Sequence, residues 1–333
     1  MTILICADLG GTQGMGHASR MVAVAQELMR LSQDVAFLTR TPELPRWFRA
    51  HGYDWRVYCE PNCATEYDLL DRPLPGNPDV IVIDRKDYYD ALIFQKLRRQ
   101  TKVVRIDHPD AAKDTADLLV IPNMHQPPEV LDRLHEDFEE CLLCGSDYVM
   151  LSKTVSDMAT VPYAERERSI VFFAGGSDPN HLLLDMYRAT RELRLDHGQK
   201  IFVVGQMSGK IEMDAPDSHS IVTGFDYQTL AMASLAVGPL SVTAYEAMRL
   251  GTPVLTFPGI PSDEPCMEAL DNVTGGAVQT FTASGGDFRD VLLEQLRVLW
   301  HDKDARRWMS RQTQQMIDGQ GARRVADAIW ILA

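Results

Sequence analysis

The sequence contains few cysteines, no long apolar run and a deficit of positive charge. Six cysteines in 333 residues are too few for a disulfide scaffold in a chain of this size. No apolar run approaches the roughly 20 residues that a membrane-spanning helix needs. A formal net charge of −14 argues against a general nucleic-acid binder, which would carry a basic surface. These absences leave a chain whose fold depends on its apolar core.

Nothing at the N-terminus resembles a targeting segment. No basic residues precede the apolar run Thr2–Ala7, and Asp8 interrupts it. A secretory signal needs a basic start followed by a longer apolar stretch. We therefore expect no signal peptide and a cytoplasmic protein, with peripheral attachment to a membrane left open.

Two pairs of cysteines have the spacing of zinc half-sites. They are Cys59 with Cys63, and Cys141 with Cys144. The second pair lies in an apolar CLLC run that resembles a buried strand, where reduced thiols would simply fill the core. We therefore expect reduced core thiols and no bound metal.

Short apolar strands alternate with amphipathic helices over most of the chain. Apolar residues make up 45% and charged residues 24% of the sequence, as in globular proteins, and 333 residues are enough for two domains. Nearly all-apolar strands separated by helices indicate parallel sheets that are covered on both faces. The strands expected in the first half are Thr2–Ala7, Asp34–Leu38, Val80–Ile83, Val103–Ile106 and Leu118–Ile121.

The second half repeats this pattern, and its strands run into glycine-rich turns. The expected strands are Ile170–Ala174, Lys200–Val204, His219–Val222, Leu235–Val237 and Pro253–Phe257. We expect an α/β fold with two Rossmann-like parallel-sheet domains facing a central cleft. The expected boundaries are 1–150 for the first domain, 151–168 for a linker, 169–315 for the second domain, and 316–333 for a C-terminal helix that packs back on the first.

A glycine-rich turn after the first strand is the most informative motif. The segment Gly10–Arg20 reads GGTQGMGHASR, and an apolar-periodic helix, Met21–Leu31, follows it. Such a turn lets backbone N–H groups approach a ligand, and a helix N-terminus favours anions. His17 lies at the helix start as a candidate general base, and Arg20 lies one helical turn further on. A tight turn with an incidental histidine is the structural alternative.

A second glycine-rich turn, GGSDPN, opens the second half at Gly175–Asn180. Ser177 and Asp178 stand where a helix N-cap belongs, and Pro179 fits the first helical turn. A capped helix explains these residues but not the doubled glycine. The doubled glycine favours an anion site at this turn.

A third motif, GPLSVTAYEAMRLGTP, spans Gly238–Pro253. It predicts a strand that leads through Ser241 into a helix with Thr243 and Glu246 in its first turns. Hydroxyl and backbone N–H groups there suit a phosphate, and a carboxylate suits a vicinal diol such as ribose. The alternative for Glu246 is a solvated surface charge.

A fourth motif, PSDEPC at Pro261–Cys266, is another polar turn before a helix. Its carboxylates, Asp263 and Glu264, either contact sugar hydroxyls or cap that helix.

The first half also carries a basic and aromatic segment. Its residues are Arg40, Arg46, Trp47, Phe48, Arg49 and Arg56, with Arg85, Lys86, Lys96, Arg98 and Arg99 later. Such a face suits an anionic acceptor or a membrane surface. Amphipathic helices with cations near their C-termini explain it more simply, and we favour that explanation.

Together these motifs resemble the GT-B group of nucleotide-sugar enzymes, most closely PseG-type UDP-sugar hydrolases and MurG-like glycosyltransferases. The likeness extends to about Leu270. The GxGHxxR turn at Gly14–Arg20 is similar to the loop whose histidine is the proposed base of that group. GGSDP at Gly175–Pro179 is similar to the loop that faces the donor phosphates. Thr243, Glu246, Gly251 and Pro253 are similar to a pattern whose glutamate binds ribose.

This chain departs from the PseG-like pattern at three places. Cys6 stands where those chains have an arginine, Arg85 and Lys86 stand where they have His-Tyr, and Glu264 stands where they have asparagine. The positions expected to touch the sugar are therefore altered, while the donor-binding pattern is kept.

The resemblance implies a set of site residues. His17 would be the catalytic base. The phosphate-binding residues would be Gly14, Gly16, Gly175, Gly176, Ser177, Ser241, Val242 and Thr243. The nucleoside and ribose would contact Gly224, Phe225 and Glu246. The sugar or acceptor would contact Arg20, Asp84, Asp107, Asp263 and Glu264.

The implied activity is inverting glycosyl transfer from a nucleotide-sugar donor, expected to be UDP-linked, with no cofactor or metal required. A PseG-like hydrolase that releases free sugar and UDP is the alternative, and a nonenzymatic nucleotide-sugar binder is a third. The acceptor, be it a sugar, a lipid-linked group, a small molecule or a polymer, and the oligomeric state are left open.

Overall fold

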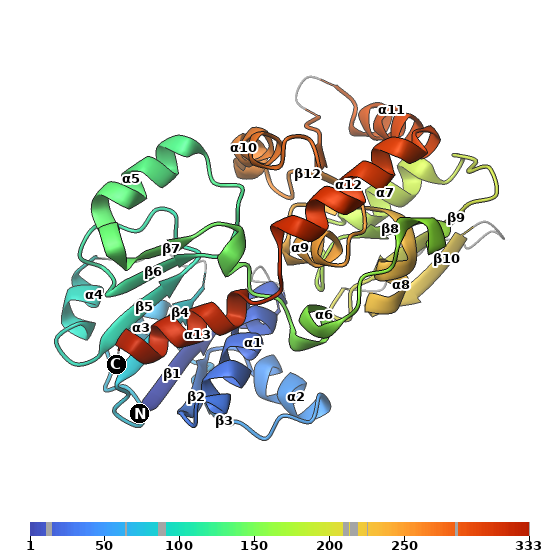
Figure 1. Ribbon diagram of the computed structural model, residues 1–333. Helices are drawn as coiled ribbons and strands as arrows, with labels where there is room; N and C mark the ends of the chain where they lie inside the picture. Colours follow the sequence, from blue (N-terminus) through green and yellow to red (C-terminus); the bar gives the residue numbers. More distant parts are fainter. Residues whose placement is uncertain are drawn as a thin grey trace. The chain divides into compact units, whose positions relative to one another are not determined.

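The chain folds into two compact units, each built on a parallel sheet (Figure 1). Unit 1 comprises Met1–Asn123, Pro128–Ser152 and Gln320–Ala333, and unit 2 comprises Met124–Pro127 and Lys153–Gly319. The computed structural model describes residues 1–10, 15–63, 65–85, 91–208, 213, 219–224, 226–283 and 286–332.

The sheet of unit 1 has seven parallel strands in the order β3-β2-β1-β4-β5-β6-β7. The strands are β1 (Thr2–Ala7), β2 (Asp34–Thr39), β3 (Arg56–Cys59), β4 (Val80–Asp84), β5 (Lys102–Ile106), β6 (Leu118–Ile121) and β7 (Leu142–Cys144). All five residues of β4 are buried, as expected for a central strand with both faces covered.

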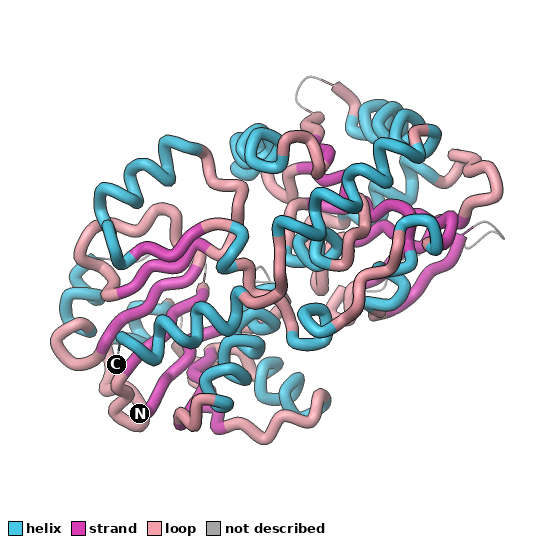
Figure 2. The backbone as a smooth tube through the Cα atoms, viewed as in Figure 1, coloured by secondary structure: helices cyan, strands magenta, loops and turns pink. Residues whose placement is uncertain are grey.

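Helices cover both faces of this sheet (Figure 2). They are α1 (Gly16–Arg30), α2 (Glu43–Ala50), α3 (Glu66–Leu70), α4 (Ala91–Leu97), α5 (Pro128–Phe138) and α13 (Gly321–Leu332). Because strand side chains alternate between faces, Leu4 and Cys6 share one face, where they join a core with Phe94 of α4. In Figure 1, α13 lies along α1, and these two helices pack on each other.

The sheet of unit 2 has six parallel strands in the order β10-β9-β8-β11-β12-β13. The strands are β8 (Glu167–Phe173), β9 (Gln199–Val204), β10 (His219–Thr223), β11 (Ala233–Pro239), β12 (Val254–Phe257) and β13 (Gln279–Thr280). Counted from the first strand of each unit, this order repeats that of unit 1. The two halves therefore share one topology.

The helices of unit 2 also lie on both sides of their sheet (Figure 2). They are α6 (Lys153–Asp157), α7 (Leu182–Thr190), α8 (Tyr227–Met232), α9 (Val242–Arg249), α10 (Glu264–Thr274), α11 (Phe288–His301) and α12 (Lys303–Met316). Phe172 of β8 and Val237 of β11 join a core with Met186 of α7 and Leu296 of α11.

The prediction of two Rossmann-like parallel-sheet units is confirmed. Each expected strand is present, and β1 has the predicted bounds. The short edge strands β3 and β13 were not predicted. The first helix, α1, starts at Gly16, so His17 lies at the helix start as expected, and the apolar-periodic stretch predicted from Met21 onward continues the same helix to Arg30.

The expectation of buried thiols at the CLLC run was wrong for Cys141. This residue ends a 3-10 turn, Glu139–Cys141, and is exposed, while Cys144 on the edge strand β7 is half-buried. An edge strand is covered less than a central one, so an apolar run there does not bury every side chain. None of the six cysteines, all of which lie within the described ranges, forms a disulfide.

Among the helices of the described ranges, none combines the length and apolar character needed to cross a membrane. In the same part of the chain, no group of three or more His, Cys, Asp or Glu side chains has a metal-binding arrangement.

Candidate functional site

In both units the glycine-rich motifs follow a strand that borders the point where the strand order of the sheet reverses. In an open parallel sheet, ligands bind at the carboxyl ends of strands where the strand order reverses. That point lies between β1 and β4 in unit 1, and between β8 and β11 in unit 2. The glycine-rich turns predicted from the sequence follow β1 and β8, so each falls at such a point.

In unit 1, His17 is the second residue of α1 and pairs with Asp84 at the end of β4. The distance from His17 Nδ1 to Asp84 Oδ1 is 2.6 Å. Asp84 is fully buried and His17 is 5% exposed. Gly16 is the first residue of α1, whereas Gly14 lies outside the described residues.

The charge of Asp84 fixes the tautomer of His17. Burial opposes ionisation of Asp84, but Arg20 and His17 outweigh it and hold the pKa of this carboxyl below its ordinary value. An ionised carboxylate can only accept hydrogen bonds, so Nδ1 of His17 must be the donor. The neutral imidazole then carries no proton on Nε2, which is the ring atom left to act as a base.

Arg20 lies one turn after His17 on α1 and joins two carboxylates. Its Nε donates to Asp84 Oδ2 at 2.6 Å and its Nη2 to Asp84 Oδ1 at 2.5 Å. Its Nη1 donates to Asp107 Oδ2 at 2.9 Å. Burial alone would lower the pKa of Arg20, but these carboxylates raise it, so the guanidinium stays charged.

Asp107 follows β5 and takes a left-handed backbone conformation with φ +61°. Aspartate tolerates this conformation better than most residues, and such strain is found at functional positions. Its other oxygen accepts from Nδ2 of Asn123, which follows β6, at 3.0 Å. The carboxyl ends of β4, β5 and β6 thus meet around Arg20.

The structure therefore brings together four residues that the sequence analysis singled out. His17, Arg20, Asp84 and Asp107 form one hydrogen-bonded cluster, although Arg20 and both carboxylates were expected to contact sugar or acceptor. Arg20 and Asp84 are buried and bind each other. Asn123 was not among the predicted site residues, although its place directly after the expected strand Leu118–Ile121 was a signal that could have found it.

The basic and aromatic segment of unit 1 is partly internal. Arg40 donates to buried Asp8 at 2.9 Å, and buried Arg85 lies 3.3 Å from the same carboxylate. The ring of Phe48 packs edge-on against Phe37. Only part of the segment, including exposed Arg46, faces outward. Of its other cations, Arg49 and Lys96 lie in the last turns of α2 and α4.

In unit 2, the turn after β8 is shaped by close backbone packing. Gly175 takes φ +78°, and the amide of Met207 donates to the carbonyl of Gly176 at 2.9 Å. A Cβ atom on Gly205, after β9, would lie 2.3 Å from that carbonyl oxygen. Because Gly205 has no Cβ atom, the turn after β8 and the turn after β9 can pack against each other. The loop Gly175, Gly176 and Ser177 is thus seated against the neighbouring strand end.

The prediction that Pro179 lies in the first turn of the next helix was wrong. α7 starts at Leu182, so Pro179 precedes the helix instead of lying in its first turn. Asp178 still caps it from a distance, because its carboxylate accepts from the amides of Leu182 and Leu183 at 2.8 and 3.1 Å. Burial raises the pKa of Asp178. These amides are therefore already paired with a carboxylate.

The N-terminus of α9 is different because no side chain caps it. Ser241 is the N-cap residue in an extended conformation, and its side chain accepts no first-turn amide. Its hydroxyl instead donates to the carbonyl of Pro239 at 3.1 Å. First-turn N–H groups have no intrahelical acceptor, so those of Val242 and Thr243 can serve an anion.

Glu246 lies in the second turn of α9 and is buried. The alternative that it is a solvated surface charge was therefore wrong. Glu246 is 4% exposed, and it accepts from the hydroxyl of Tyr227 at 3.0 Å and from Thr243. Burial raises the pKa of Glu246 to about 7, and these two hydroxyls oppose the rise only in part.

The remaining predicted contacts lie on turns of unit 2. Gly224 follows β10 with φ +83°, and Phe225 lies outside the described residues. Asp263 accepts from the amide of Ile260 at 3.3 Å in the turn before α10. Glu264 is exposed at the start of α10. This hydrogen bond closes the 3-10 turn Pro261–Asp263, and the prediction that Asp263 caps the following helix was wrong, because its side chain forms no cap hydrogen bond with α10.

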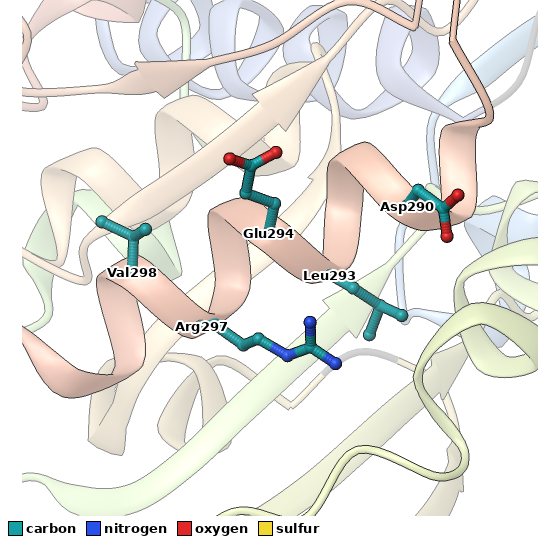
Figure 3. A pocket seen from close by; sticks show the side chains of 5 residues that line it. All are labelled: Asp290, Leu293, Glu294, Arg297 and Val298. Carbon is teal, nitrogen blue, oxygen red and sulfur yellow. The ribbon is translucent and has the colours of Figure 1, made fainter.

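A shallow surface pocket of about 420 Å³ lies along α11 (Figure 3). It is lined by Asp290, Leu293, Glu294, Arg297 and Val298, which follow one another along the helix. None of the residues assigned from the motifs contributes to it.

The chain has the GT-B fold of nucleotide-sugar glycosyltransferases. MurG from Acinetobacter baumannii is 16% identical, with 99% of both chains covered and a TM-score of 0.65. CalG4, the calicheamicin glycosyltransferase, is 15% identical over 99% of this chain and 97% of its own, with a TM-score of 0.64. SpnG, a spinosyn rhamnosyltransferase complexed with thymidine diphosphate, is 16% identical over 98% of this chain and 100% of its own, with a TM-score of 0.59.

Comparison of the sequence with protein families and with other proteins adds two findings. No family model matches the chain. An uncharacterized protein of Methanocaldococcus jannaschii, MJ1062, is 24% identical over 275 residues, which cover 77% of this chain and 55% of that protein. The chain therefore spans about half the length of this relative.

The buried carboxyl of Glu246 predicts a measurable dependence of stability on pH. Its pKa is about 7 in the folded chain against 4.5 ordinarily, so the folded state holds a proton that the unfolded state releases between these values. The free energy of unfolding should therefore fall as pH rises from 4.5 to 7, by up to about 3 kcal/mol. Glu246→Gln removes this loss, so its melting temperature relative to wild type should rise across that window and level off above pH 7.

Thermal melts from pH 4.5 to 8 check this expectation. Glu268→Gln, on the exposed side of α10, is the matched control and should follow wild type. A constant offset between Glu246→Gln and wild type at every pH would contradict the raised pKa.

Proposed function

We propose that this chain is a glycosyltransferase that moves a sugar from a UDP-linked donor to a hydroxyl acceptor with inversion at the anomeric carbon. The observation that carries the proposal is the His17–Asp84 pair at the switch point of the first sheet. The GT-B fold and the glycosyltransferases similar to it in structure support the reaction class.

In this proposal unit 1 supplies the base. Nε2 of His17 takes the proton of the acceptor hydroxyl as its oxygen attacks the anomeric carbon. Asp84 accepts from Nδ1 and stabilises the imidazolium that forms, as a carboxylate does for a catalytic histidine elsewhere. Arg20, Asp107 and Asn123 act as positioning residues, because they hold Asp84 ionised and in place.

Unit 2 holds the donor. As the acceptor oxygen bonds to the anomeric carbon, the bond from that carbon to the phosphate oxygen breaks and the nucleoside diphosphate leaves. Backbone N–H groups of Val242 and Thr243, at the uncapped start of α9, stabilise the charge that develops on it. Glu246 binds the ribose. Gly175, Gly176 and Ser177 complete the phosphate contacts, and Gly224 and Phe225 contact the nucleoside.

The donor and the reaction type can be tested together. Thermal shift with UDP, CDP, GDP and dTDP, and with their sugar conjugates, should give the largest rise in melting temperature for the UDP series. Slow release of UDP that a hydroxyl acceptor accelerates supports the transferase. Rapid release of free sugar from a UDP-sugar without acceptor supports the hydrolase instead. No shift with any nucleotide overturns the donor site.

His17→Ala should lower turnover by roughly two to four orders of magnitude, because the acceptor proton then has no base to receive it. Donor affinity should stay nearly unchanged, since His17 belongs to unit 1 and does not bind the nucleotide. Steady-state kinetics and calorimetric titration with UDP measure the two effects. If turnover survives, His17 is not the base.

Asp84→Asn should lower turnover by two orders of magnitude or more, because a side-chain amide no longer fixes Nδ1–H of His17. It also leaves Arg20 without one of its two carboxylates, so the melting temperature should fall. Nucleotide affinity should change less than about twofold. Asp34→Asn, at an exposed pair with Arg56, is the matched control. Turnover equal to wild type in folded Asp84→Asn would refute the role of this carboxylate.

A further inference from the structure

Tyr227 and Glu246 join two different turns of unit 2. Tyr227 is the first residue of α8, which follows β10, and Glu246 lies on α9, which follows β11. Their contact, 3.0 Å from the tyrosine hydroxyl to Glu246 Oε1, links segments that start at opposite sides of the β9–β8 pair.

The start of α8 is held firmly by its own cap. Asp226 accepts from the amides of Gln228 and Thr229 at 3.1 and 3.2 Å, and from the hydroxyl of Thr229 at 2.8 Å. These hydrogen bonds, that of the Thr229 hydroxyl first, lower the pKa of Asp226. Tyr227 follows directly, so this cap sets the direction from which its hydroxyl reaches Glu246.

The carboxyl group of Glu246 depends on hydroxyl donors alone. Within the described ranges, no Lys, Arg or His lies within ion-pair distance of it, and its pKa responds only to burial and to the hydroxyls of Tyr227 and Thr243. In the same part of the chain, the charged side chains of α6 and α12, which pack against α9, form no ion pair with Glu246; Lys153 of α6, for example, pairs with Asp157. The side chain of a helical residue leans toward the helix N-terminus, so Glu246 leans toward Thr243 and the uncapped amides of α9.

A ribose offers the same kind of donor that this carboxyl group already uses. Its 2′- and 3′-hydroxyls can donate to one carboxylate, whereas a protonated carboxyl group has lost part of its capacity to accept. Ionisation of a buried carboxyl without a cation therefore becomes more favourable when further donors arrive, and near or below its pKa a ligand that brings them promotes loss of the proton.

We propose that Tyr227 is a positioning residue that holds the Glu246 carboxyl group as an acceptor for a ribose diol, so that unit 2 prefers ribonucleotides to 2′-deoxyribonucleotides and releases a proton from Glu246 to solvent when it binds them. This inference rests on the nucleotide-sugar function proposed above. It adds the discrimination between sugars and the coupling to pH, neither of which follows from a binding glutamate alone.

The expected pH dependence has a definite sign. Below pH 7 the proton on Glu246 must leave before the diol binds, so affinity for UDP should fall as pH decreases, approaching tenfold for each unit. Above pH 7 affinity should be constant. 2′-Deoxy-UDP offers one donor fewer, so it should bind about five- to tenfold more weakly at pH 8 and depend less on pH.

Tyr227→Phe removes one donor and keeps the ring. The carboxylate is then less stabilised, so the pH below which UDP affinity falls should move upward, and affinity at pH 7 should drop about three- to tenfold. The ratio between UDP and 2′-deoxy-UDP should shrink at pH 7. Tyr163→Phe is the matched control: its hydroxyl binds Arg306 in the same unit and does not contact Glu246.

Calorimetric titration of the full chain with UDP and 2′-deoxy-UDP, from pH 5.5 to 8.5, measures these effects. Two buffers with different heats of ionisation count the released protons, expected to be near half a proton per UDP at pH 7. A shift in the pH profile for Tyr227→Phe but not for Tyr163→Phe supports the proposal. A purely structural role would lower affinity without moving the profile.

Two results overturn the proposal and can be told apart. If wild type binds UDP without proton release and Tyr227→Phe keeps the same pH profile and the same preference over 2′-deoxy-UDP, the inference fails while the donor function stands. If neither nucleotide binds wild type at any pH, the donor function fails and this inference fails with it.

Discussion

The ion pair between Arg20 and Asp84 is the interaction on which the chemistry of unit 1 depends. Asp84 is fully buried, and a buried carboxyl without a cation becomes protonated. The guanidinium keeps it ionised, and only an ionised carboxyl compels His17 to donate from Nδ1. A buried cation therefore decides which ring nitrogen of His17 can act as a base.

Unit 2 places a buried carboxyl in the opposite situation. Glu246 has hydroxyl partners and no cation within the described ranges, and its pKa rises to about 7, whereas that of Asp84 falls. Asp84 ends β4 and Glu246 lies on the helix that follows β11, and both strands border a switch point, so topology does not distinguish the two carboxyls. The difference comes from the nearest charge. Asp84 is suited to stay ionised at all times, whereas Glu246 is suited to ionise when a ligand binds.

The sequence predicted secondary-structure elements better than it predicted which residues contact each other. The bounds of β1 were predictable because Asp8 ends its apolar run, and the shared face of His17 and Arg20 follows from helical spacing. The contact of His17 with Asp84, 67 residues apart, was not predictable, because β4 lies beside β1 only through the strand order.

The roles of individual polar residues were the least predictable. Burial of Glu246 depends on α8, and its partner Tyr227 had no motif of its own. Pro179 matched the first turn of a helix by composition, yet Asp178 with φ +41° lets its carboxylate reach the amides of a helix that starts three residues after the proline. Local patterns identify residues that can bind or cap, while the turn geometry decides which of them do.

The last helix has a consequence for synthesis of the chain. α13 packs along α1 in unit 1, yet it follows every residue of unit 2. During translation, the sheet of unit 1 emerges with the face of α1 still uncovered, and it stays so until the ribosome has finished the second sheet. An apolar helix face exposed for that time is a site for chaperones or for aggregation. Folding of the unit that carries the proposed base is thus complete only after unit 2 has been synthesised.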